Sequence, residues 1–131
     1  MDVLGSRILL RPRDAERSQA FYREVLGLAI AREFGPPEHR GLVFFLGPSL
    51  LEVTPGNADA PGLNPDGIAL WLQVRDVRAE RERLVASGVS VRREPRREPW
   101  GLIEMWIDDP DGVQIVLVEI PADHPLRKDQ R

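Results

Sequence analysis

Acidic residues and histidines are the side chains of this chain that could ligate a metal ion or act as a general base, and Glu52 is one of them. It stands in LLEVT, where apolar neighbours predict a strand. A carboxylate on such a strand can ligate a metal ion or act as a general base. The two histidines fall elsewhere, His39 in the loop GPPEHRG and His124 in the polar tail ADHPLRKDQR. We interpret both histidines as surface residues.

Three tryptophans are the other candidate site residues. Trp71 and Trp106 stand on predicted strands, where one residue in two faces a given side, and Trp100 stands in the loop before the second of these strands. Indole rings at such positions suit stacking on a planar or apolar ligand. The alternative is that all three pack in the core or in an interface.

Other chemistries find little support. Without cysteine there are no disulfides, thiolate metal sites or cysteine nucleophiles. No glycine pattern predicts a phosphate loop, and no serine has a triad context. Asp109-Pro110-Asp111-Gly112 lacks the spacing of an EF-hand and predicts a hairpin turn. The mixed-charge runs RAERER and RREPRRE are interpreted as solvated faces.

Length and charge set further limits. The chain has 131 residues, 42% of them hydrophobic and 30% charged, which fits one domain. A net charge of −3 argues against nucleic acid, which favours a basic surface. The N-terminus lacks a signal pattern, and the apolar runs are too short to span a bilayer. We therefore expect a cytoplasmic protein that binds neither nucleic acid nor membrane.

The elements that position these residues occur twice. A strand, a helix capped by Asp14 and ended by Gly27, and three strands make the first unit, at about residues 4–55. A linker at 56–66 follows, then the second unit at 67–121, with its helix between Asp76 and Gly88, and a polar tail at 122–131. In the second helix, Val77, Leu84 and Val85 are expected to face inward.

The repeat predicts the fold class. Two tandem βαβββ units give an α+β domain covering 1–131, in which curved mixed sheets surround a cup-shaped cavity and the helices lie outside. Such a cavity is a common place for a small-molecule ligand.

The segments DAERSQAFYREVLGL and PWGLIEMWIDDPDGVQIVLVE resemble the first-helix and C-terminal signatures of the vicinal oxygen chelate superfamily, from about Arg7 to Glu119. This superfamily includes glyoxalase I, extradiol dioxygenases, and fosfomycin- and bleomycin-resistance proteins. The resemblance implies the fold directly, whereas one fold hosts many chemistries.

The resemblance also implies where a metal would bind. In the enzymes, four strands each give one ligand, usually His, Glu, His and Glu. The matching positions here are Arg7, Glu52, Ala69 and Val116. Because Glu52 alone is a ligand type, we expect no metal and no cofactor, as in the bleomycin-resistance-like branch.

These observations leave three functions open. The first is metal-independent binding of a small apolar or aromatic molecule, as in antibiotic sequestration or resistance. The second is a lyase, isomerase or cyclase, or a dioxygenase relative, in which Glu52 is the acid or base. The third is a regulatory or interaction module whose own side chains fill the cup. We expect a homodimer, as in small superfamily members, because half-sized apolar sheets leave edges and faces to cover.

The expected ligand-binding set is Arg7, Glu52, Trp71, Trp100 and Trp106. Arg7 and Glu52 take positions that would point at one ion in the metal-binding relatives. We therefore expect the guanidinium to substitute for the lost cation and to pair with Glu52. The alternative is a frayed first strand whose Arg7 reaches solvent.

Overall fold

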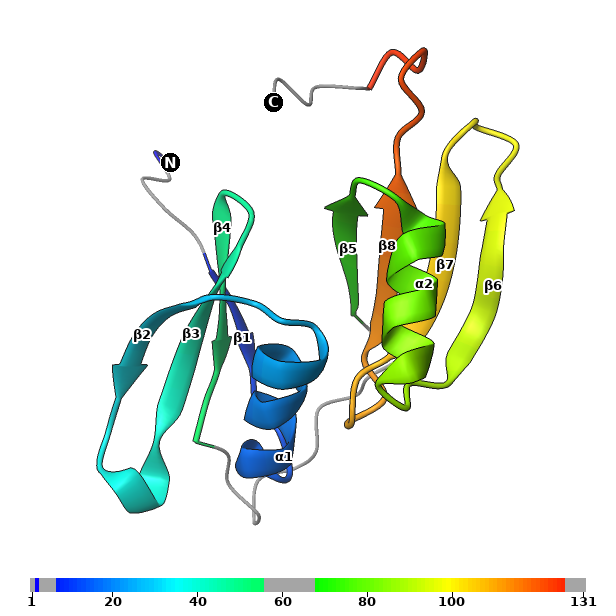
Figure 1. Ribbon diagram of the computed structural model, residues 1–131. Coiled ribbons are helices and arrows are strands. Elements are labelled where there is room, and N and C mark those ends of the chain that lie inside the picture. The colour runs from blue at the N-terminus through cyan, green and yellow to red at the C-terminus, as the bar shows by residue number, and fades with distance from the viewer. Residues whose placement is uncertain (1, 3–6, 56–67, 127–131) are drawn as a thin grey trace. The chain divides into compact units, whose positions relative to one another are not determined.

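A computed structural model describes residues 2, 7–55 and 68–126 of the chain (Figure 1). The chain divides into two compact units, Met1–Asn64 and Pro65–Arg131. The predicted linker at 56–66, the last tail residues and most of the start of the first unit lie outside the described residues. Each unit is described separately below.

Both units follow the predicted order of one strand, one helix and three strands. The first contains β1 (Arg7–Leu10), α1 (Ala15–Ala20), a π-helical turn (Phe21–Val25), β2 (Ile30–Phe34), a 3₁₀ turn (Pro37–His39), β3 (Gly41–Leu46) and β4 (Ser49–Val53). The second contains β5 (Ala69–Val74), α2 (Val77–Ala86), β6 (Val91–Arg97), β7 (Ile103–Asp108) and β8 (Gln114–Glu119). The α+β repeat is therefore confirmed.

Each unit forms one mixed four-stranded sheet with the same connectivity. The strand orders are β1-β4-β3-β2 and β5-β8-β7-β6. The first strand of each unit pairs in parallel with the last, and the other pairs are antiparallel. The final strand is thus central, so a residue on β4 or β8 has neighbours on both sides.

The helix starts follow the sequence signals. The carboxylates of Asp14 and Asp76 accept hydrogen bonds from the N–H groups of Arg17 and Ala79, at 3.1 and 3.0 Å. These bonds satisfy amides that have no partner within the helix. In the second unit, Glu119 on β8 also accepts from the N–H of Val77 at 3.1 Å, which ties the helix start to the central strand.

One face of each sheet is covered by the helix of its unit and holds the core (Figure 1). In the first unit, Tyr22 and Phe44 are fully buried, with ring centroids 6.3 Å apart. In the second, Leu84 of α2 is buried with Met105 and Ile115 of the sheet. Val85 is 43% exposed, so its predicted inward position is wrong; one residue turns the helix by about 100°, away from the Val77 and Leu84 side.

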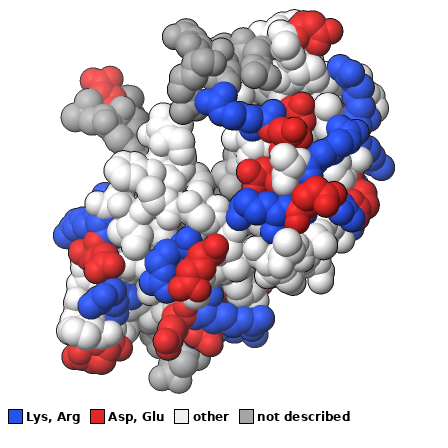
Figure 2. All heavy atoms as spheres, viewed as in Figure 1, with Lys and Arg blue, Asp and Glu red and all other residues white. Residues whose placement is uncertain are grey.

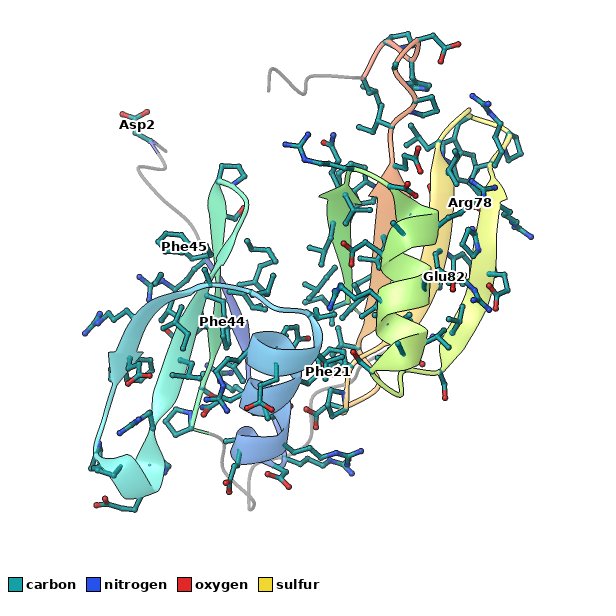
Figure 3. The ribbon with its side chains drawn as sticks, viewed as in Figure 1. Asp2, Phe21, Phe44, Phe45, Arg78 and Glu82 are labelled. Atoms are coloured by element: carbon teal, nitrogen blue, oxygen red, sulfur yellow. The ribbon has the colours of Figure 1, made fainter. Side chains whose placement is uncertain are left out.

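The other face of each sheet, opposite its helix, is called the open face here. Strand alternation and register assign its residues, so Phe45 lies opposite to its buried neighbour Phe44 (Figure 3). The open face of the first unit includes Arg7, Leu9, Phe45, Leu50 and Glu52. That of the second includes Ala69, Trp71, Gln73, Glu104, Trp106, Val116 and Val118. Large apolar side chains are exposed on both, with Phe45 at 53% and Trp71 at 52%.

Candidate functional site

Two tryptophans lie in one row across the open face of the second sheet. Trp71 on β5 pairs in register with Val116 on β8, and Val116 pairs with Trp106 on β7. Neighbouring strands lie about 4.8 Å apart, so the two tryptophan backbones are separated by roughly 10 Å across a valine. A planar ring held between two parallel rings needs about 7 Å. The row therefore places one indole on either side of Val116 on the open face.

An arginine supports Trp106 from the far side of this row. Arg93 on β6 is the cross-strand partner of Trp106, and its guanidinium carbon lies 3.9 Å from the indole centroid. Arg93 also donates to Glu98, whose side chain is 3% exposed and which accepts a second bond from Arg96 at 3.3 Å. The solvated interpretation of RREPRRE is therefore wrong for Glu98, which is buried, and for Arg93, which is half-buried, because their charges neutralise each other.

Two N–H groups in this cluster are buried without a hydrogen-bond partner among the described residues. They are Nε of Arg93 and Nε1 of Trp106. Buried donors without acceptors are rare because each forfeits its hydration. In this cluster, the two side chains are packed against each other while one N–H group of each lacks an acceptor.

Trp100 reaches the same open face through its side chain. Its indole Nε1 donates to the Glu104 carboxylate at 2.9 Å, and Glu104 stands two positions before Trp106 on β7. The indole itself is 57% exposed, whereas Glu104 is only 7% exposed. Trp100 is thus joined, through Glu104, to the strand that carries Trp106.

The tail fixes the loop that carries Trp100. The Nε2 of His124 lies 2.9 Å from the carbonyl oxygen of Trp100, and the N–H of Leu126 donates to Nδ1 of His124 at 3.1 Å. A carbonyl only accepts, so Nε2 carries the proton and Nδ1 is the acceptor. His124 therefore anchors the tail rather than standing free on the surface.

In the first unit, Arg7 and Glu52 converge as predicted. The Nη1 of Arg7 lies 2.9 Å from Oε1 of Glu52, and their side chains are 40% and 15% exposed. Glu52 lies on central β4, where Leu9 and Val43 flank it in register. The frayed-strand alternative is excluded, because Arg7 begins β1 and pairs with Leu50.

The four positions implied for a metal do not fit one. Glu52 is already bound by a guanidinium, and Ala69 and Val116 offer no donor atom. Within residues 7–55 and 68–126, no three His, Asp or Glu side chains gather as metal ligands.

Sequence reasoning missed Glu104, Arg93 and Glu98. Glu104 and Trp100 are four residues apart, but a loop and a strand separate them, so no helical or strand period links them. Arg93 lies in a run of charged residues, and only the register between β6 and β7 brings it beside Trp106. The available signal was the alternation EMW, which puts Glu104 and Trp106 on one face.

Two βαβββ units, each with one helix-covered and one open sheet face, define a class of tandem-repeat α+β proteins. The Glyoxalase/Bleomycin resistance protein/Dioxygenase superfamily matches residues 6–117, and the chain belongs to this family. The resemblance found in the sequence is thereby confirmed.

Named relatives differ in their activities. The chain is 31% identical over 119 residues to "Lactoylglutathione lyase" of Haemophilus influenzae, covering 85% of this chain and 88% of that protein. A superfamily member from Sphaerobacter thermophilus is similar in structure, with 25% identity, a TM-score of 0.67 and coverage of 91% and 98%. TnmS3, an antibiotic binding protein from Streptomyces sp. CB03234, has 23% identity, a TM-score of 0.69 and coverage of 92% and 98%. The likeness to TnmS3 shows the fold alone.

In the described part of the chain, no helix has the length and apolar character needed to cross a bilayer. The longer of its two α-helices, α2, has ten residues and carries interleaved charges of both signs on its outer surface (Figure 2).

Proposed function

We propose that the chain binds a small apolar or aromatic molecule on the open face of its second sheet, without a metal ion, and that it sequesters an antibiotic. The observation that carries the proposal is the row Trp71, Val116 and Trp106, which presents two indoles around a small apolar floor. Trp100 adds a third, exposed ring beside it. Stacking on such rings adds about 0.5–1.5 kcal/mol beyond area burial.

A second candidate is a lyase, and the likeness to lactoylglutathione lyase favours it. The ion pair at Glu52 argues against it: Glu52, the acid or base expected for such an enzyme, is held by Arg7 at 2.9 Å. Proton uptake by Glu52 would break this ion pair. We therefore place binding before turnover.

Calorimetric titration with planar aromatic antibiotics tests the proposal. We expect saturable binding that quenches tryptophan fluorescence, is weakened about tenfold in Trp71→Ala, and is largely retained in Trp71→Phe. Leu126→Ala, on the exposed tail, is the matched control for loss of an exposed apolar side chain. Unchanged binding in Trp71→Ala would contradict the proposed site.

A parallel assay separates the two candidates. The protein is incubated with methylglyoxal and glutathione, with and without added divalent metal, and formation of the lactoylglutathione thioester is followed. We expect no turnover above background. Turnover that is lost in Glu52→Gln would establish the lyase instead.

A further inference from the structure

The Glu104 carboxylate is a buried charge without a cationic partner in the described residues. It is 7% exposed, and its hydrogen bond there comes from the neutral indole N–H of Trp100 at 2.9 Å. Arg96 is its cross-strand neighbour, but Nε of Arg96 donates to Glu98 at 3.3 Å. Glu98 therefore has two guanidinium partners, and Glu104 has none among residues 7–55 and 68–126.

Such a carboxylate is costly in the free protein. Burying an ion without a counter-ion sacrifices hydration that a single indole N–H restores only in part. An apolar residue or a glutamine would fill the same space at lower cost. A ligand that brings a positive charge to this carboxylate would regain the lost interaction on binding.

The position of Glu104 relative to the tryptophan row decides which ligand can bring a positive charge to its carboxylate. Glu104 precedes Trp106 by two residues on the same face of β7. Its register partner on the antiparallel strand β8 is Val118, which follows Val116 by two residues. The two rows are separated by about 7 Å along the strands. A flat ring system above Val116 therefore has its edge beside the carboxylate.

From this juxtaposition we propose that the open face of the second sheet selects planar aromatic cations, whose rings stack in the row Trp71–Val116–Trp106 and whose positively charged nitrogen pairs with Glu104. This inference rests on the proposed function and names its ligand class. Electron-rich indole faces also favour a cationic ring over a neutral one. The positive charge of Arg93 on the far side of Trp106 is balanced by Glu98.

A pair of isosteric probes tests the proposal. 1-Methylquinolinium and 1-methylnaphthalene have the same shape and differ in one ring atom, which is a charged nitrogen in the first. We expect the wild-type protein to bind the cation roughly tenfold to a hundredfold more tightly, measured by calorimetry. In Glu104→Gln, which keeps an acceptor for Trp100, this preference should fall to about twofold or less.

Two variants control for charge and for folding. Glu94→Gln removes the same charge from the same unit, but Glu94 pairs with Arg81 of α2 on the helix-covered side, so the preference should persist. Glu104→Asp keeps the charge and retracts it, so an intermediate preference is expected. A thermal melt of each variant verifies that it is folded.

The affinities of the two probes distinguish failure of this inference from failure of the proposed function. If Glu104 only positions Trp100, Glu104→Gln keeps that contact and the preference for the cation stays as in the wild-type protein, so the inference is wrong while the proposed function stands. Equal binding of both probes to the wild-type protein has the same consequence. If neither probe binds, both the proposed function and the inference are overturned.

Discussion

The contact between Arg7 and Glu52 shows how a ligand position can be converted into a structural pair. The guanidinium lies where the family resemblance puts a metal ligand, and it donates to the one carboxylate that remains of the set. Glu52 is 15% exposed and central in its sheet, so losing Arg7 would leave a partly buried charge. Because Arg7 is 40% exposed, water screens part of the attraction.

A double-mutant cycle with Arg7→Met and Glu52→Gln should give a coupling free energy of about 0.5–1 kcal/mol, measured by chemical denaturation. The control pair is Arg92 and Asp108, 3.0 Å apart, whose side chains are 55% and 39% exposed. Greater screening should make its coupling smaller. Equal coupling for the two pairs would show that burial of Glu52 contributes nothing.

Within a single strand, the sequence was enough to predict which residues of the candidate site share a face. Ala69 and Trp71 are two residues apart, so their shared face follows from alternation alone. The place of Glu104 in the candidate site could not be predicted in this way. It depends on a hydrogen bond from Trp100 in a loop and on the order of β5, β8 and β7 in the sheet. Cross-strand register is set by the whole sheet, and no single segment encodes it.

The elements themselves were largely predictable, since caps and glycines mark their ends. Asp14 and Asp76 begin helices, and Gly27 and Gly88 end them with φ of 71° and 87°, values that favour glycine. The π-helical turn at Phe21–Val25 was not predictable. Its sequence continues the apolar helical pattern, and the change in hydrogen bonding leaves no mark in residue type.

The tail packs against the loop that carries Trp100, and substitutions of glycine can test this contact. Gly101 has φ of +91°, and a Cβ placed there would lie 3.1 Å from Cδ2 of His124. Gly88 has φ of +87° and nothing within 4 Å of such a Cβ. Both alanine variants should lose about 1–2 kcal/mol of unfolding free energy from backbone strain. Gly101→Ala should lose roughly 1 kcal/mol more from the contact with His124.

Removing the imidazole isolates this added cost. In a His124→Ala background, Gly101→Ala and Gly88→Ala should destabilise the protein equally in denaturant titrations. A persistent difference would mean that the tail does not press on the loop.

The ion pair between α2 and β6 should make stability depend on pH. Arg81 donates to both carboxylate oxygens of Glu94, at 2.7 and 3.3 Å, and this hydrogen bonding lowers the pKa of Glu94. A lowered folded-state pKa stabilises the protein above the unfolded-state pKa of glutamate, and the contribution is lost as pH falls through the folded-state value. The melting temperature of Glu94→Gln should therefore lie slightly below that of the wild-type protein at neutral pH. The two should converge in acid, and a constant difference would contradict the pair's role.

Each unit of the chain buries only one face of its sheet against its own helix. The open faces carry Leu9, Phe45 and Trp71, which are 44%, 53% and 52% exposed within the structure. Apolar side chains clustered on a sheet face are typical of interaction surfaces and ligand sites. Small units of this size also bury too little surface to be very stable alone. We infer that part of these faces is covered by a second copy of the chain.

The predicted homodimer can be tested with one substitution on an open face and one elsewhere. Sedimentation equilibrium at micromolar concentration should give twice the 14.8 kDa chain mass. Phe45→Ser should shift the equilibrium toward monomer, because exposing a phenylalanine-sized contact costs about 2–3 kcal/mol of association free energy. Val85→Ser is the matched control, since Val85 is 43% exposed on α2 and should leave the mass unchanged. A single-chain mass for the wild-type protein would exclude the dimer, and a dimer insensitive to Phe45→Ser would place its interface outside the open face of the first unit.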